Sequence, residues 1–60
     1  MDMSVLARIL LTHPGLLHRA YEVGPTQEIQ DAILTLQPTL KPDFIKKRLP
    51  QAIKECMFYV

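Results

Sequence analysis

The chain has 60 residues, of which 48% are hydrophobic, and its formal net charge is +1. A chain of this length buries only about 60% of the surface that its unfolded form exposes, which is close to the lower limit for folding without a disulfide or a metal. The length allows one small domain, residues 1–60, and leaves little room for the enclosed pocket of an enzyme. We therefore expect a non-enzymatic protein.

The single cysteine and the first residues bear on the cellular setting. Cys56 has no second cysteine with which to form an intramolecular disulfide, which favours a reducing, cytoplasmic environment. The chain begins Met-Asp-Met-Ser, with an acid where a signal peptide carries basic residues. No segment approaches the roughly 18 apolar residues that a membrane-spanning helix needs, so we expect no membrane partner.

Apolar residues in the first third of the chain recur at helical spacings of three and four. Either Asp2 or Ser4 can cap the N–H groups of the opening turn. The predicted stripe comprises Val5, Leu6, Ile9, Leu10, His13, Leu17 and Ala20.

Pro14 interrupts this stripe. Its ring would clash with the carbonyl of Leu10, so the sequence predicts two short helices that meet near Pro14. The second helix should end at about Val23, because Gly24 can adopt a left-handed conformation and Pro25 prevents continuation.

The middle of the chain predicts a third helix. Thr26 is expected to cap it, Glu28 suits the positive end of the helix dipole, and Pro38 ends it. Its apolar stripe is formed by Ile29, Ala32, Ile33 and Leu36.

The last unit begins at Pro42 and carries an apolar stripe that keeps its phase across Pro50, which predicts one continuous helix kinked at this proline. The stripe comprises Phe44, Ile45, Leu49, Ala52, Ile53, Cys56, Met57 and Val60. No segment alternates with period two, so strands are not expected. The predicted fold is all-α, a compact array of three or four short helices.

Large apolar residues stand side by side in several places, and such neighbours point about 100° apart on a helix. They cannot all face one core, so some should lie at the surface and mark an interaction site. The candidates for partner binding are Leu10, Leu11, Phe44, Met57, Phe58 and Tyr59. The C-terminal residues allow two interpretations, an edge strand added to a partner or a tail packed on the helices.

Charge is distributed unevenly along the chain. Residues 1–40 carry two cations and four acids, whereas residues 41–60 carry five cations and two acids. The cluster Lys46, Lys47 and Arg48, followed by Lys54, suits either the charged rim of a protein interface or a face that binds nucleic-acid phosphates. The near-neutral total charge and the lack of a helix-turn-helix layout favour the protein interface.

The sequence gives little indication of a metal site or a catalytic site. His13, His18, Glu22 and Cys56 are the main potential ligands, but they lack the paired spacings of a zinc site. Cys56 lies on an apolar stripe, where a thiol behaves as a small hydrophobic group. The sequence predicts no catalytic residue, no metal and no cofactor.

These observations predict a small protein–protein interaction module that acts as a regulator, inhibitor or accessory subunit. Its partner would be a larger protein, a second copy of the chain, or both. The alternative is a nucleic-acid-binding protein that uses the basic face of residues 46–54.

Overall fold

The computed structural model describes residues 4–59 and shows four helices: α1 (Val5–Thr12), α2 (Pro14–Val23), α3 (Gln27–Leu36) and α4 (Pro42–Cys56). No strand occurs in residues 4–59, and the predicted all-α array is confirmed. Asp2 and Val60, which the sequence placed at the first cap and at the end of the last stripe, lie outside the described residues.

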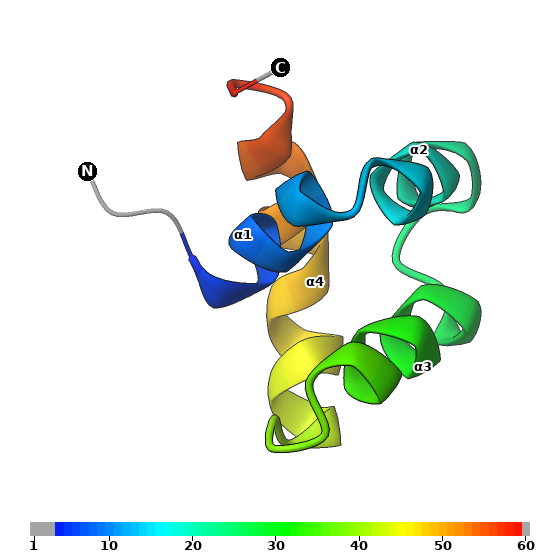
Figure 1. Cartoon of the computed structure of the whole chain (residues 1–60), viewed down its shortest axis with the longest axis vertical. Helices are drawn as coiled ribbons and strands as arrows, with labels where there is room; N and C mark the ends of the chain where they lie inside the picture. Colours follow the sequence, from blue (N-terminus) through cyan, green and yellow to red (C-terminus); the bar gives the residue numbers. More distant parts are fainter. Residues whose placement is uncertain (1–3, 60) are drawn as a thin grey trace.

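The longest helix, α4, organises the fold (Figure 1). Helix α1 crosses the C-terminal half of α4, and α3 packs near the N-terminal half of α4. Helix α2 lies to one side and contacts α1, α3 and α4. The four helices together form a domain that measures 25 × 25 × 18 Å. Because α1 and α4 make the largest helix–helix contact, the first and last helices of the described chain lie against each other.

The first three helix boundaries follow from capping groups. Ser4 is the N-cap of α1, and its hydroxyl accepts a hydrogen bond from the N–H of Ala7 at 3.2 Å. His13 ends α1 by donating its N–H to the carbonyls of Ile9 and Leu10. The same residue precedes Pro14, which opens α2 at its first position as predicted.

Two details of the α2–α3 connection differ from expectation. Gly24 has φ 77° and ψ −167°, which is an extended conformation with positive φ rather than the left-handed helical one. This region is essentially open to glycine alone. Thr26 is the N-cap of α3, as predicted, but its side chain makes no capping hydrogen bond. The predicted position of the cap is therefore right, and the predicted hydrogen bond is wrong.

Helix α4 continues through Pro50, which confirms the predicted single helix. Pro50 is exposed and has no N–H, so the carbonyl of Lys46 loses the bond that residue i+4 normally donates. The expected kink follows from this loss and from the ring clash.

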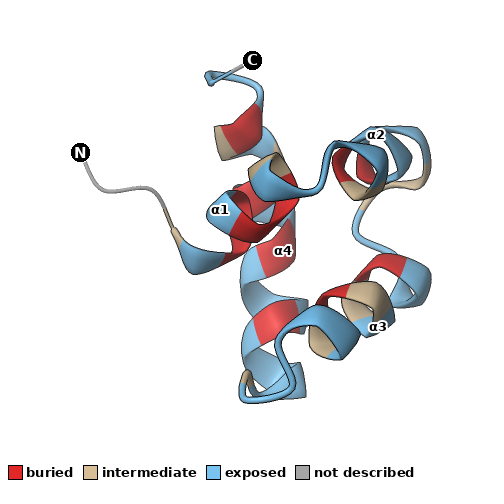
Figure 2. Ribbon diagram, in the orientation of Figure 1, coloured by how far each residue is buried: buried red, intermediate tan, exposed pale blue. Residues whose placement is uncertain are grey.

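The core is a single cluster gathered on the inner faces of the helices (Figure 2). Leu10 is completely buried, so its predicted place at a partner surface is wrong. Leu11 is half-buried and packs against the core, whereas Val5 is 51% exposed and leaves the predicted stripe. Helix α1 can bury adjacent residues because α4 and α2 cover it from two sides. The buried apolar residues are Leu6, Ala7, Ile9, Leu10, Leu17, Ala20, Ile29, Ile33, Ile45, Leu49, Ala52 and Cys56.

Candidate interaction surface

The surplus of apolar residues does reach the surface. Among the described residues, the large apolar side chains with substantial exposure are Val5, Tyr21, Leu36, Phe44, Met57, Phe58 and Tyr59. Four of them, Phe44, Met57, Phe58 and Tyr59, belong to the partner-binding set expected from the sequence. They do not form one patch, because Phe44 lies near the start of α4 and the other three follow its end.

A largely apolar concavity lies between the C-terminal parts of α2 and α4. We call it the α2–α4 hollow; it encloses about 450 Å³ and is lined by Ala20, Tyr21, Gly24, Ile53 and Met57. Tyr21 is 40% exposed and Met57 is 64% exposed, so two large side chains are accessible from opposite sides of the hollow. Partial removal from water raises the pKa of the Tyr21 phenol.

Two further exposed apolar residues follow Met57 in the chain. Phe58, which at 86% is the most exposed large apolar residue that the structure describes, and Tyr59 directly follow Met57. The N–H groups of all three donate to carbonyls three residues earlier, at 3.0 to 3.1 Å. Residues 57–59 therefore form turns, and the interpretation as an extended edge strand does not fit them.

Charged residues follow two of the lining residues in the sequence, but they are not part of the lining of the hollow. On the α2 side, Glu22 follows Tyr21 and lies 3.9 Å from His18. On the α4 side, Lys54 follows Ile53 and is exposed.

A second apolar cleft lies between the start of α1 and α4. It encloses about 300 Å³, and its lining includes Val5, Phe44 and Arg48. The Ser4 N–H donates to Oε2 of Glu55 at 3.4 Å, which closes one end of this cleft. Phe44 and Arg48 are therefore neighbours here, away from Met57 and the hollow.

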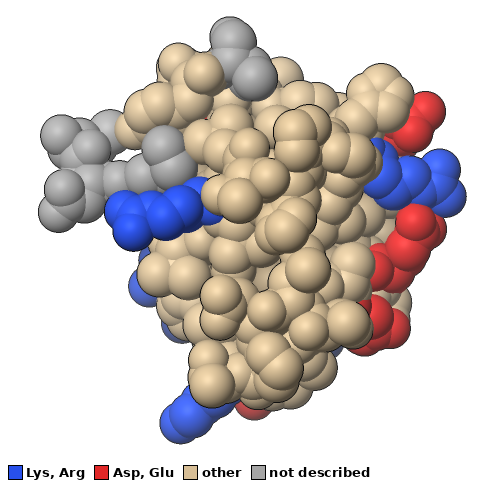
Figure 3. Space-filling view, in the orientation of Figure 1, with Lys and Arg blue, Asp and Glu red and all other residues tan. Residues whose placement is uncertain are grey.

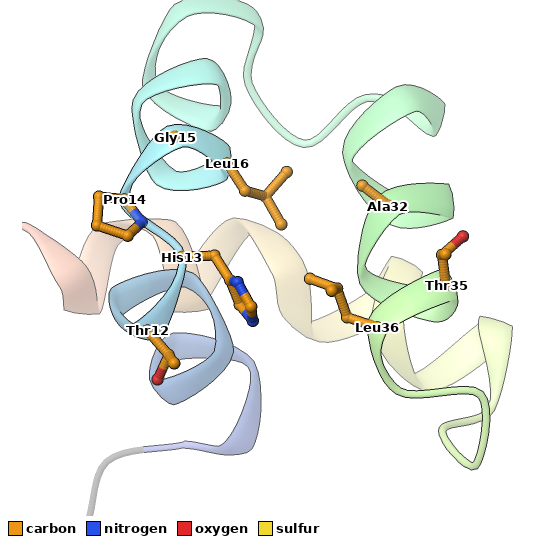
Figure 4. Close-up of a pocket in the computed structure, with 8 residues that line it drawn as sticks. All are labelled: Thr12, His13, Pro14, Gly15, Leu16, Ala32, Thr35 and Leu36. Atoms are coloured by element: carbon orange, nitrogen blue, oxygen red, sulfur yellow. The ribbon is translucent and has the colours of Figure 1, made fainter.

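A further groove lies where the α1–α2 junction faces α3 (Figure 4). It encloses about 570 Å³, and the side chains of His13, Leu16 and Leu36 converge on it. The hydroxyls of Thr12 and Thr35 donate to carbonyls of their own helices, at 2.7 and 2.9 Å. The groove thus offers one imidazole among apolar walls, which is not the set of convergent polar groups that catalysis needs.

The basic cluster does not form one face. Consecutive helical residues point about 100° apart, so Lys46, Lys47 and Arg48 face three directions around α4. Arg48 faces the cleft with Phe44, whereas Lys47 and Lys54 are exposed and, being seven residues apart, share one side of α4. In residues 4–59, none of these cations forms an ion pair with a carboxylate.

Acidic groups gather on the other side of the molecule. In Figure 3 most of them lie along the edge formed by α2 and α3, and a broad uncharged face separates them from the basic groups at the opposite edge. Arg19 joins these two helices, because its Nε and Nη2 donate to the two carboxylate oxygens of Glu28 at 2.8 and 3.1 Å. This hydrogen bonding raises the pKa of Arg19 and lowers that of Glu28.

The potential metal ligands lie apart. No three histidine, cysteine, aspartate or glutamate side chains within residues 4–59 come together as a metal site. Cys56 is buried, and its thiol donates to the carbonyl of Ala7 with a sulfur–oxygen distance of 3.5 Å. Burial raises the pKa of this thiol, which opposes formation of a reactive thiolate. Within the same residues, no helix combines the length and the apolar character that crossing a bilayer requires.

A search of protein-family models, curated proteins and solved structures found no match to this chain. The surface must therefore be interpreted from its own geometry and charge. The structure brings Met57 together with Tyr21 and Ile53, two residues that the sequence did not assign to a site. Tyr21 stands four positions after the core residue Leu17, a spacing that places it near the core side of α2, but the predicted stripe did not include it.

Proposed function

We propose that this chain is a non-enzymatic protein-interaction module that docks on a larger protein through the α2–α4 hollow and so acts as a regulator, inhibitor or accessory subunit. One observation carries the proposal: Tyr21 and Met57 stay exposed on either side of an apolar hollow, next to Phe58. Aromatic and flexible apolar side chains that meet at a concavity are typical anchors of protein interfaces.

The charged residues have a supporting role in this proposal. Lys46, Lys47 and Lys54 lie outside the hollow, so they would act as rim charges that speed association and favour an acidic partner surface. An intracellular setting is part of the same proposal, since the lone buried thiol suits a reducing compartment.

Nucleic-acid binding is the second candidate, because Lys47 and Lys54 share an exposed face of α4. Asp43 lies four residues before Lys47 and belongs to the same face, which weakens its attraction for phosphate. The dispersal of the other cations around α4 argues in the same direction.

Affinity capture from the source cells, after nuclease treatment, tests the proposal with a matched pair of variants. Tyr21 and Phe44 are both aromatic and both 40% exposed, but they lie in the hollow and in the α1–α4 cleft respectively. We expect Tyr21→Ala to lose the captured protein and Phe44→Ala to retain it, with both variants folded by circular dichroism. Equal retention by both variants would contradict docking at the hollow.

A second experiment decides between protein and nucleic acid. The wild type and the double variant Lys47→Glu/Lys54→Glu are titrated against labelled duplex DNA and single-stranded RNA at about 50 and about 200 mM salt. We expect no binding at the higher salt. Tight binding that weakens steeply with salt and disappears in the double variant would replace protein docking with phosphate recognition.

A further inference from the structure

The two sulfur-containing residues at the end of α4 have opposite environments. Cys56 is buried, its thiol donates to the carbonyl of Ala7, and burial raises the pKa of this thiol. Met57, the next residue, is 64% exposed and is the only methionine in residues 4–59. An oxidant that reaches the described part of the chain therefore meets the thioether of Met57, whereas the thiol of Cys56 is shielded.

Met57 also has a defined place on the surface. It lines the α2–α4 hollow together with Tyr21 and Ile53, and its N–H donates to the carbonyl of Lys54 at 3.1 Å. Among the residues that line the hollow, Tyr21 alone has a polar side-chain group, its phenol. An oxygen atom added to the sulfur of Met57 therefore makes the α4 side of the hollow polar.

We propose that Met57 is a redox-sensitive switch of the α2–α4 hollow: oxidation of its thioether to the sulfoxide releases the docked protein, and reduction restores docking. The inference rests on the docking role proposed above. The sulfoxide has a strongly polar S–O bond, so its transfer from water into an apolar contact is unfavourable. Oxidised Met57 thus loses the flexible apolar contact that suits methionine to interfaces.

Hydrogen peroxide is the oxidant in this reaction. A lone pair of the Met57 sulfur attacks one peroxide oxygen, the O–O bond breaks as the S–O bond forms, and the other oxygen leaves as water after proton transfer. Sulfur loses two electrons and peroxide gains them. A methionine sulfoxide reductase reverses the change with a dithiol, which becomes a disulfide while the oxygen leaves as water.

The position of Met57 separates oxidation from unfolding. Met57 follows the last residue of α4 and is largely exposed, so the added oxygen lies outside the core. We expect the oxidised protein to keep its circular dichroism spectrum and its urea midpoint of unfolding. The thioether has no proton that titrates, so its oxidation rate should be the same at about pH 6 and about pH 8, unlike that of a thiol.

Peroxide treatment of the purified chain, removal of the peroxide and peptide mapping measure the oxidation. We expect one added oxygen on Met57 and a Cys56 thiol that still reacts fully with a thiol reagent after denaturation. In the capture experiment described for Tyr21→Ala, the oxidised form should retain roughly a tenth or less of the captured protein. The two stereospecific methionine sulfoxide reductases, supplied with dithiothreitol, should restore capture.

Two variants locate the effect, and each is compared with its own untreated sample. Met57→Leu has no thioether in the hollow, so peroxide should leave its capture unchanged. The double variant Leu36→Met/Met57→Leu moves the thioether to the exposed end of α3, outside the hollow. Peptide mapping should then show oxidation at position 36, again without a change in capture.

The outcomes distinguish the switch from docking itself. Full capture by the oxidised wild type, where Tyr21→Ala has lost it, would overturn the switch and leave docking at the hollow intact. The switch would also fail if Cys56 were oxidised before Met57, if treated Met57→Leu lost capture equally, or if capture stayed low after the sulfoxide was reduced. Retention of the captured protein by Tyr21→Ala would overturn both proposals.

Discussion

Replacing Leu10 by alanine separates a core role from a surface role. The side chain has no exposed area and lies where α1 meets α4, so its truncation leaves a cavity as well as losing apolar burial. Leucine-to-alanine changes at such sites cost about 2 to 5 kcal/mol of unfolding free energy. A domain of 60 residues has only about 3 to 9 kcal/mol in total.

The adjacent residue supplies the comparison. Leu11 is half-buried, so Leu11→Ala should cost about half as much, roughly 1 to 2 kcal/mol. Urea titrations followed by circular dichroism at neutral pH measure both variants against the wild type. We expect the unfolding midpoint to fall much further for Leu10→Ala, with the denaturant slope unchanged for both.

The expected loss of stability in Leu10→Ala is large enough to measure by thermal unfolding. At about 4 to 8 °C per kcal/mol for a domain this small, Leu10→Ala should lower the melting temperature by at least about 8 °C. A loss of less than about 1 kcal/mol, or a Leu11→Ala variant that is the less stable of the two, would show that Leu10 is not part of the core.

Three further perturbations test other parts of the fold. Pro50→Ala should raise stability by up to about 3 kcal/mol, because it restores the N–H donated to the Lys46 carbonyl, and a urea titration that shows a loss would contradict this. Gly24→Ala should cost about 1 to 3 kcal/mol of unfolding free energy because Gly24 has a positive φ, although the added Cβ would meet no atom within 4 Å. Gly15 lies in equally open space within α2, so Gly15→Ala should be neutral or stabilising. The pKa values of Cys56 and Tyr21 are both raised, so the folded state holds these protons more tightly than the unfolded state does. The two groups therefore make their full contribution to the free energy of unfolding below about pH 8.5. The urea midpoint of unfolding should fall as the pH rises from about 8.5 through 10, and it should fall less in Cys56→Ala. A midpoint that rises over this range would contradict the raised pKa values.

The helix boundaries could be predicted because each depends on local chemistry. Pro14 and Pro42 open helices where their missing N–H costs nothing, and Ser4 caps α1 with its own hydroxyl. Thr26 has the right residue type at the right place, yet its side chain makes no capping bond. A cap position can be predicted from sequence more readily than the rotamer that completes it.

The surface could be predicted only in part, because exposure depends on which helices cover a given side. The adjacent leucines of α1 indicated a surplus, but only the packing of α2 and α4 shows that Leu10 is enclosed and Leu11 half-enclosed. Tyr21 and Met57 are 36 positions apart in sequence, and no periodicity indicates that they border one hollow. The scattering of Lys46, Lys47 and Arg48, by contrast, follows from helical geometry alone.

The contact between α1 and α4 has a consequence for synthesis on the ribosome. Cys56 bonds to Ala7 and Glu55 bonds to Ser4, so the earliest helix completes its packing with the latest one. Until residues 42–56 leave the exit tunnel, the part of the apolar face of α1 that packs on α4 stays uncovered. Folding should then occur in one late step after release of α4 rather than helix by helix, and the nascent chain is a candidate for chaperone binding during that interval.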